Sequence, residues 1–173
     1  MLTSRKIDDL ATPAKILALR FLADAKEAGI DVIVTCTLRD AEAQNALYAI
    51  GRTREELDAA GLAHVEPARG RIVTNAKGGD SYHQYGCAFD VVPLRHGKPV
   101  WGTSGDGIDD DPSDDETDDL ELWQRLGAIG EKCGLEWAGR WKRFREFPHF
   151  QYKGGLNLDD FRAGKRLANG ALP

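Results

Sequence analysis

Apolar residues recur three or four positions apart in several stretches of the chain, which is the spacing of one face of a helix. The first stretch covers residues 13–28, and we expect Thr12 to cap that helix. A second stretch covers residues 122–133, before a glycine that can end a helix. Three further positions carry residue types that favour helix N-caps: Asp40, Thr53 and Asn157.

Two runs rich in β-branched residues predict buried strands, namely IDVIVTCT at 30–37 and CAFDVVPL at 87–94. Residues 71–74 predict a short additional strand. The aromatic-rich segment 135–152 predicts a strand pair joined at Gly139. Helices come first along the chain, followed by strands, one helix and more strands. This order predicts an α+β fold with an antiparallel sheet.

Length and charge distribution predict a single domain, 1–173, with an acidic loop inserted at about 103–119. The formal net charge is −5, but ten of the 28 acidic residues fall within 106–121, which contains no basic residue. This leaves 18 acidic against 23 basic residues elsewhere, so the body of the protein is mildly basic. We interpret the insertion as a solvated loop. Its clustered carboxylates also suit calcium, although the spacing of a calcium-binding loop is missing.

Composition disfavours several classes of protein. No window approaches the roughly 18 consecutive apolar residues of a transmembrane helix, and the N-terminal segment lacks the apolar core of a signal peptide. We therefore expect a protein that is made in the cytoplasm and does not insert into membranes. We also expect it to be a monomer. No cluster of basic residues interleaved with aromatics predicts nucleic-acid binding, whereas a basic body suits another anionic polymer. Three unpaired cysteines are expected to be buried free thiols: Cys36, Cys87 and Cys133.

Three polar residues, widely separated in the sequence, have the residue types of a catalytic zinc site. His83 stands in a glycine-flanked loop, Asp90 follows on a predicted strand, and His149 lies in an aromatic-rich segment. Two imidazoles and one carboxylate occupy three zinc positions and leave a fourth for water. The alternative is structural, with the same side chains serving as hydrogen-bonding or packing groups. The remaining histidines, His64 and His96, lie in predicted loops and are expected to be solvated.

Hydrolysis at such a site also needs a general base and positive charge near the developing oxyanion. Glu146, three residues before His149, is the candidate base. An ideal strand would point these two residues to opposite faces, but Pro148 favours an edge or bulge that brings the glutamate round. Arg39, at the end of a predicted strand, is the candidate oxyanion partner, and Arg52 is the second choice. Surface ion pairs are the alternative role for Glu146 and Arg39.

Three segments resemble, in order, a family of zinc peptidases that act on bacterial cell walls. The string SYHQYGCAFD, residues 81–90, resembles the family motif SxHxxGxAxD. WAGRWKRFREFPHFQ resembles a second motif, in which an acidic residue stands three positions before the final histidine. TCTLRDAEAQNALYAIGRT resembles a third feature, an arginine followed by a glutamine-containing helix and Gly-Arg-Thr. The family includes D-alanyl-D-alanine carboxypeptidases and dipeptidases, and the L-alanyl-D-glutamate endopeptidases of phage endolysins.

The resemblance implies three zinc ligands: His83, Asp90 and His149. It implies Glu146 as the general base and Arg39 as the residue that holds the substrate carbonyl or tetrahedral intermediate. Ser81 and Gln44 match motif positions and are implied to support substrate binding. The implied fold is a small α+β domain with a central antiparallel sheet flanked by helices, shared with the hedgehog signalling domain.

The implied function is zinc-dependent hydrolysis of the L-alanyl-D-glutamate bond in the stem peptide of peptidoglycan. The expected setting is phage or prophage lysis, in which the enzyme leaves the host cytoplasm and acts on the cell wall in the periplasm. A D-alanyl-D-alanine carboxypeptidase or dipeptidase, with the same metal chemistry in a differently shaped cleft, is the first alternative. A zinc-stabilised wall-binding module without catalysis is another, and the presence of both Glu146 and Arg39 speaks against it.

Overall fold

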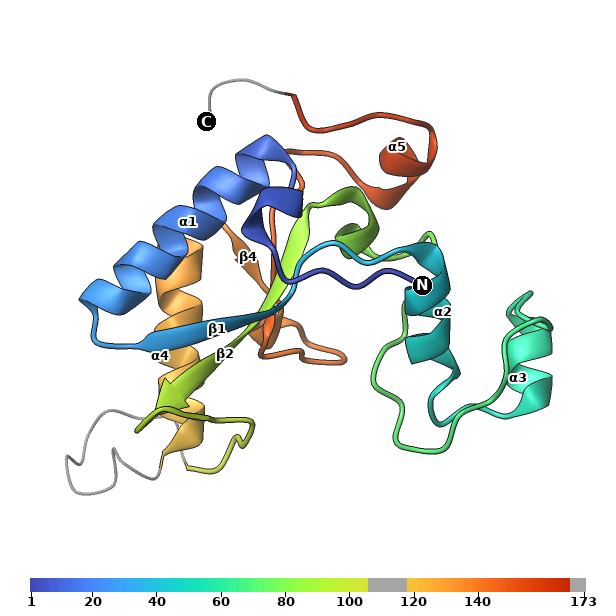
Figure 1. Cartoon of the computed structure of the whole chain (residues 1–173), viewed down its shortest axis with the longest axis horizontal. Coiled ribbons are helices and arrows are strands. Elements are labelled where there is room, and N and C mark those ends of the chain that lie inside the picture. Colours follow the sequence, from blue (N-terminus) through green and yellow to red (C-terminus); the bar gives the residue numbers. More distant parts are fainter. Residues whose placement is uncertain (106–117, 169–173) are drawn as a thin grey trace.

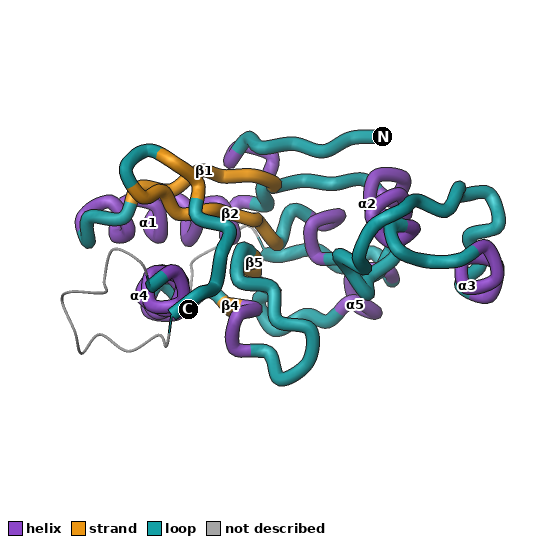
Figure 2. Tube along the Cα trace, turned by 90° about the horizontal axis from the view of Figure 1, so that it is seen from below, coloured by secondary structure: helices purple, strands orange, loops and turns teal. Residues whose placement is uncertain are grey.

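The computed structural model describes residues 1–105 and 118–168. The helices of these residues are α1 (Thr12–Glu27), α2 (Ala41–Ala49), α3 (Arg54–Ala59), α4 (Asp119–Lys132) and α5 (Leu158–Arg162), with short 3-10 helices η1 (Ile7–Asp9), η2 (Tyr82–Tyr85) and η3 (Ala138–Arg140). The strands are β1 (Asp31–Cys36), β2 (Ala88–Arg95), β3 (Lys98–Pro99), β4 (Glu136–Trp137) and β5 (His149–Gln151). Helices α1 and α4 lie at one end of the molecule, and α2, α3 and α5 lie at the other (Figure 1, Figure 2).

Local capping chemistry explains where most of the helices begin. The Asp40 carboxylate accepts a hydrogen bond from the Ala43 backbone N–H at 2.7 Å at the start of α2. Capping boxes start α3 at Thr53 and α5 at Asn157, as their sequences predict. The expected cap of α1 is wrong: Thr12 is already helical, and the preceding alanine occupies the N-cap without a side-chain hydrogen bond.

The sheet is antiparallel throughout, with the strand order β1-β2-β5-β4, and β3 pairs with the distal end of β2. In the β2–β5 pair, Asp90 lies opposite His149, and Phe89 lies opposite Phe150. Because successive strand residues point to opposite faces, this register places the two polar side chains on one face and the two rings on the other. The α+β fold with an antiparallel sheet is therefore confirmed.

Helices α1 and α4 cover the apolar face of the sheet. Phe21 of α1 packs against Phe89 and Phe150, with ring centroids 5.8 and 4.7 Å apart. Helix α4 approaches the sheet through Gly130, where an added Cβ would overlap the Phe150 ring. The main hydrophobic core lies between these two helices and the strands. The opposite face stays available for the polar residues of β2 and β5.

Two strand predictions need correction. Residues 71–74 form no strand; they are an extended loop whose Thr74 carbonyl accepts a hydrogen bond from Arg52 instead of from a neighbouring strand. The predicted pair in 135–152 exists as β4 and β5, but residues 138–148 join the strands, so Gly139 is not a tight turn. The other two strand runs are confirmed as β1 and β2, and His96 lies in a loop as predicted, at the turn between β2 and β3.

The remaining sequence predictions concern the acidic insertion, the domain boundary, the cysteines and membrane-spanning segments. Most of the acidic insertion, residues 106–117, lies outside the described residues. The hypothesis that its carboxylates bind calcium therefore also concerns residues outside the described part of the chain. The single-domain boundary stays a prediction. The three cysteines are buried and free, as expected. Among the residues that the structure describes, no helix combines the length and apolar character needed to cross a bilayer.

Candidate metal centre

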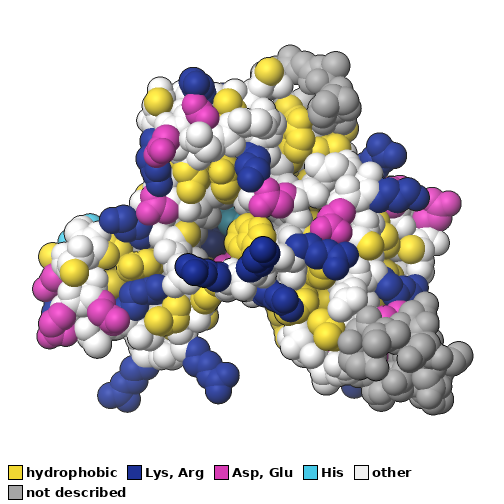
Figure 3. Space-filling view, turned by 180° about the vertical axis from the view of Figure 1, so that it is seen from behind, with side chains coloured by type: hydrophobic (Ala, Val, Ile, Leu, Met, Phe, Trp, Pro, Cys, Tyr) yellow, Lys and Arg dark blue, Asp and Glu magenta, His cyan; other side chains and the backbone are white. Residues whose placement is uncertain are grey.

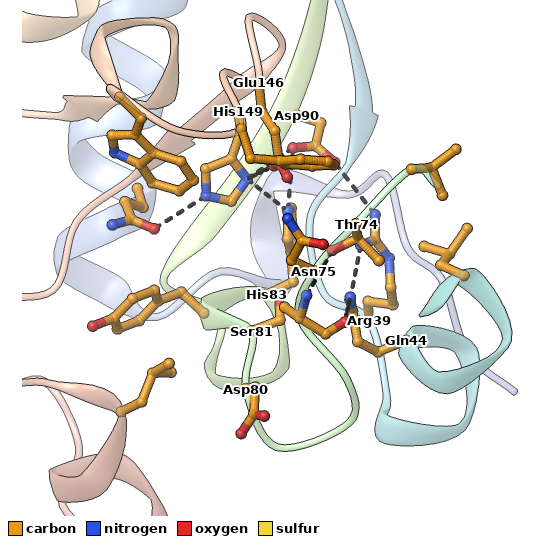
Figure 4. Close-up of a pocket in the computed structure, with 18 of the residues that line it drawn as sticks. Arg39, Gln44, Thr74, Asn75, Asp80, Ser81, His83, Asp90, Glu146 and His149 are labelled. Carbon is orange, nitrogen blue, oxygen red and sulfur yellow. Dashed lines mark hydrogen bonds and ion pairs between the residues drawn. The ribbon is translucent and has the colours of Figure 1, made fainter. Parts of the chain in front are cut away.

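Three side chains from separate parts of the chain meet on the polar face of the sheet. The atoms that point together are Nε2 of His83, Oδ1 of Asp90 and Nδ1 of His149 (Figure 4). The two imidazole nitrogens are 3.2 Å apart, and the carboxylate oxygen lies 3.2 Å from the first and 3.1 Å from the second. The structure thus brings together the three residues that the sequence proposes as ligands.

The size of this triangle fits a tetrahedral zinc ion. Zn–N and Zn–O bonds of about 2.0–2.1 Å at tetrahedral angles separate two ligand atoms by about 3.3 Å. The observed sides are within 0.2 Å of that separation. Burial by itself raises the pKa of Asp90, but the neighbouring imidazoles of His83 and His149 hold it well below its usual range. The carboxyl group is therefore in the charged form that a metal ligand requires.

A hydrogen bond at Nδ1 of His83 determines that Nε2 is the ring nitrogen available to bind a cation. Its Nδ1 lies 2.7 Å from the backbone carbonyl oxygen of Thr37, which can only accept a hydrogen bond. Nδ1 must therefore carry the proton, and Nε2 presents a lone pair toward Asp90 and His149. Partners of this kind orient metal-binding histidines and select their tautomer.

In His149 the roles of the two ring nitrogens are reversed: Nε2 makes the hydrogen bond to the protein, and Nδ1 faces the triangle. Its Nε2 lies 3.1 Å from Oε1 of Gln151, so the proton sits on Nε2 and Nδ1 is left as an acceptor. The amide group of Gln151 in turn donates to the carboxylate of Glu136, its partner across the β4–β5 pair. When both rings are neutral, these tautomers leave three lone pairs facing one another in the triangle, an arrangement that a cation stabilises. Burial lowers the pKa of His149, but its hydrogen bond to Asp90 and the charge of Asp90 raise it overall, so a metal ion bound here competes with a proton. Thr37 and Gln151 were not foreseen, because only the fold brings them to the rings.

Local backbone geometry explains the spacing of the motif at 81–90. The 3-10 helix η2 presents His83 and ends at Gly86, which adopts the left-handed conformation (φ 65°). A Cβ at Gly86 would lie 2.9 Å from the Ala11 backbone nitrogen, so the position needs glycine for both reasons. β2 then begins with the fully buried Ala88 and places Asp90 two residues later on the same face.

Glu146 lies beside the triangle. It belongs to the turn before β5, where its carbonyl accepts a hydrogen bond from the His149 backbone N–H, so strand alternation does not constrain its side chain. One carboxylate oxygen is 3.9 Å from Nδ1 of His149. Burial raises the pKa of Glu146, and the charge of Asp90 adds to this, while His149 and Arg39 oppose it. A raised pKa suits a general base that operates near neutral pH.

Arg39 points into the same site but is already engaged with protein groups. Its Nη2 lies 3.3 Å from Oδ2 of Asp90 and 3.0 Å from Sγ of Cys36, and its Nη1 donates to Gln44 at 3.0 Å. The guanidinium therefore holds the carboxylate oxygen that faces away from the triangle. Its Nε is buried without a hydrogen-bond partner among the described residues.

The other three sequence candidates occupy different places. Gln44 is buried; besides accepting from Arg39, it donates to the Ala76 carbonyl at 2.8 Å. Ser81 is buried at the start of η2 and lines the same hollow as the triangle. Arg52 lies outside this lining; it stacks on Tyr48 and donates to the Thr74 carbonyl at 2.9 Å. Arg52 therefore supports a wall of the hollow and is not placed to contact an oxyanion.

A different grouping of potential ligands contains Cys36 with His83 and Asp90. Its sulfur, however, lies 3.7 Å from Nδ1 of His83, the nitrogen that already donates to Thr37. Burial raises the pKa of the Cys36 thiol to about 11, which disfavours the thiolate that metals bind. The geometry therefore favours His149 as the third ligand.

The triangle lies in an open hollow of ≈ 580 Å³. Its walls come from η2, α2, the loop at 73–76 and the connection at 141–146. Figure 3 looks into a depression in which a histidine surface is visible, with lysine and arginine side chains gathered around it. Such a hollow, with convergent polar groups and a partly buried acid, has the character of an active site.

Sequence comparisons identify relatives of this chain. A family model described as D-alanyl-D-alanine carboxypeptidase matches residues 74–152. The chain is 35% identical over 130 residues to the peptidoglycan L-alanyl-D-glutamate endopeptidase CwlK of Bacillus subtilis (strain 168), covering 75% of this chain and 65% of that protein. It is 26% identical over 170 residues to the L-alanyl-D-glutamate peptidase of Listeria phage A118, covering 96% and 47%. The chain thus spans less than two thirds of the length of these curated relatives.

The fold also has known counterparts. The vancomycin resistance D,D-pentapeptidase VanY, solved in complex with Zn(II), superposes with a TM-score of 0.50 at 18% identity, covering 88% of this chain and 83% of that one. At this identity the likeness shows a shared fold. The family resemblance expected from the three motifs is confirmed by the sequence matches.

Proposed function

Because this chain is related to the D-alanyl-D-alanine carboxypeptidase family, we propose that it is a zinc-dependent peptidase that hydrolyses the L-alanyl-D-glutamate bond of peptidoglycan. The observation that carries the proposal is the triangle of acceptor atoms from His83, Asp90 and His149, spaced for one tetrahedral cation. The choice of scissile bond is supported by the names of the two curated relatives.

Zinc is the metal that this donor set fits, since two imidazoles and one carboxylate leave one position open. When bound, zinc supplies a Lewis acid that acidifies water and polarises the scissile carbonyl. Zn(II) in the VanY structure supports the choice of metal. Calcium has no comparable support among the described residues.

Glu146 moves the proton in the proposed reaction. Its carboxylate takes a proton from the attacking water as the water oxygen bonds to the alanyl carbonyl carbon. The same carboxyl group then returns that proton to the departing amine as the C–N bond breaks. Its position, 3.9 Å from Nδ1 of His149, lets it reach a water on the open side of the triangle.

Arg39 has two proposed roles that follow from its contacts. By holding Oδ2 of Asp90, it aims Oδ1 at the two imidazoles. Its positive charge also lies at the floor of the hollow, where it stabilises the oxyanion that forms from the carbonyl. Ser81 and Gln44 line the same hollow and are proposed to contact substrate or support Arg39.

The decisive experiment digests purified sacculi with zinc-loaded protein and identifies the new ends by mass spectrometry. Cleavage of the proposed bond exposes the amino group of D-glutamate, whereas the carboxypeptidase alternative releases D-alanine. Glu146→Gln is expected to lower kcat about 10²–10⁴-fold, because an amide cannot accept the proton of water. Its zinc content should match that of the parent protein. Full activity of this variant would exclude the mechanism.

The biological setting of the reaction is also a proposal. Peptidoglycan is the proposed partner, and the protein is proposed to act on the wall after release from the cytoplasm. One relative comes from a bacterium and the other from a phage, so a phage or prophage origin stays a prediction. The monomeric state likewise stays a prediction. The non-catalytic binding module is disfavoured, since Glu146 lies beside the triangle.

A further inference from the structure

Exposed apolar side chains gather beside the metal centre. Ile72, Val73, Trp101 and Phe144 are between 38% and 59% exposed, and all four line one hollow of ≈ 390 Å³. They come from three separate loops, at 72–73, 101–103 and 144–148. Exposed apolar surface that converges from distant segments on one hollow is a sign of a binding site. Its volume falls in the range of about 300–1,000 Å³ that small-ligand sites occupy.

This hollow, which we call the Trp101 hollow, is continuous with the proposed active site. Asp90, Glu146 and His149 line both the Trp101 hollow and the larger hollow that holds the triangle. The scissile bond must lie at these shared residues. A substrate with groups on both sides of that bond therefore extends into the Trp101 hollow in one direction and into the larger hollow in the other.

The two hollows differ in chemistry. The Trp101 hollow presents an exposed indole, aliphatic side chains, the Thr103 hydroxyl and Arg145, whose Nε donates to the Trp141 carbonyl at 3.3 Å. The larger hollow carries Arg143. Neither Arg143 nor Arg145 has an ion-pair partner among the described residues, and Val73 and Phe144 line both hollows. The difference lies in the exposed indole and the Thr103 hydroxyl, which only the Trp101 hollow has of the two, so this direction suits a partly apolar group with hydroxyls, while Arg143 in the other direction can pair with a carboxylate.

The proposed substrate has the same polarity about its scissile bond. On the carbonyl side, L-alanine is joined through a lactyl group to the sugar N-acetylmuramic acid, which carries hydroxyls, an acetamide and flat C–H-rich faces. Two residue-length units, roughly 7 Å, separate the sugar from the scissile carbonyl. On the amine side, D-glutamate carries a free α-carboxylate, and the residues beyond it extend the peptide.

We propose that the Trp101 hollow binds the N-acetylmuramic acid of the substrate, on the carbonyl side of the scissile bond. The apolar face of the sugar lies against the indole, and its hydroxyls meet Thr103 and Arg145. The carboxylate-bearing part of the peptide runs toward Arg143. This inference rests on the proposed L-alanyl-D-glutamate specificity. In a D-alanyl-D-alanine substrate, five residue-length units, roughly 17 Å, would separate the sugar from the scissile carbonyl, which places the sugar much farther from the triangle.

The test compares two substrates with the zinc-loaded protein. One is N-acetyl-L-alanyl-γ-D-glutamyl-diaminopimelate, and the other is the same tripeptide attached to N-acetylmuramic acid. The parent protein is expected to have a lower KM for the sugar-bearing substrate. Trp101→Ala should reduce this preference roughly tenfold through KM, with kcat for the sugar-bearing substrate retained, since loss of one central aromatic contact has about this effect. Trp101→Phe should restore part of the preference.

Leu19→Ala provides a matched control, because Leu19 is an exposed apolar residue on α1, the helix that covers the opposite face of the sheet. Its preference ratio should equal that of the parent protein. If Trp101→Ala changes both substrates equally, or neither, the sugar site is excluded while the peptidase function stands. If the parent protein cleaves neither substrate, the proposed function fails and the sugar site fails with it.

Discussion

Gln151→Leu should weaken zinc binding, although Gln151 is not itself a ligand. Its Oε1 accepts the proton of His149 Nε2 at 3.1 Å, and the side chain is buried in β5. Leucine has a similar volume but cannot accept that hydrogen bond. The imidazole then loses the partner that fixes its tautomer, and a buried N–H is left unsatisfied. Losing such a partner raises the zinc dissociation constant about 10- to 100-fold, or about 1.4–2.7 kcal/mol.

The weaker zinc binding of Gln151→Leu can also be measured as a smaller stabilisation of the folded protein by zinc. At a free zinc concentration of 100 times the parent Kd, binding stabilises the folded protein by about 2.7 kcal/mol. For Gln151→Leu at the same zinc concentration, the stabilisation falls to about 0.4–1.4 kcal/mol. One kcal/mol corresponds to about 2–4 °C in Tm for a chain of this size. The zinc-induced rise in Tm should therefore fall from about 5–11 °C to between about one seventh and one half of the parent value.

Thermal unfolding with and without zinc, together with chelator competition for Kd, measures both quantities. The difference between the two scans removes any effect of the substitution on the metal-free fold. Gln84→Leu is the matched control, since Gln84 is a half-buried glutamine whose amide oxygen accepts a hydrogen bond from the Gly79 backbone N–H, away from the three proposed ligands and from Arg39. A Gln151→Leu protein with the parent zinc increment would refute the role assigned to this hydrogen bond.

Two further predictions test the ligand set and the core. Cys36→Ala should keep stoichiometric zinc, whereas His149→Ala should lose it, measured by elemental analysis after dialysis; the reverse result would favour the cysteine grouping. Gly130→Ala should lower the unfolding free energy by up to about 2 kcal/mol, because overlap with the Phe150 ring costs about 1–3 kcal/mol and offsets a helix-propensity gain of about 1 kcal/mol. Ala128→Gly, at an exposed position of α4, measures that propensity term by itself, and a Gly130→Ala protein more stable than the parent would contradict the packing.

Local rules predicted the elements whose causes are local. The caps at Asp40 and Thr53 depend on residues within one helical turn, so their sequences were sufficient. The wrong strand at 71–74 shows the opposite case. A short β-branched run becomes a strand only when a neighbouring backbone is free to pair with it, and here Arg52 takes the Thr74 carbonyl. That contact spans 22 residues, and no periodicity within the run reports it.

The candidate site also contains some residues that the sequence predicts and others that only the fold brings into place. The three proposed ligands follow from residue type and motif spacing, and β-pairing of Asp90 with His149 then sets their distance. The groups that fix the histidine tautomers could not be foreseen. Thr37 acts through its backbone carbonyl, which any residue would provide, so its identity carries no signal. Gln151 gives a weak sequence signal, because a polar residue two positions after His149 lies on the same face of β5 and can reach its ring.

The distribution of the site between strands and loops suggests how specificity and metal binding are separated. Asp90 and His149 come from paired central strands whose reverse faces are fixed by the core, so their separation tolerates little change. The walls that would contact substrate come from loops, including Val73, Trp101 and Phe144. Loops accept substitution with less effect on the fold than core strands do. Changes in these loops should therefore alter the preference among substrates while leaving the zinc affinity near that of the parent protein.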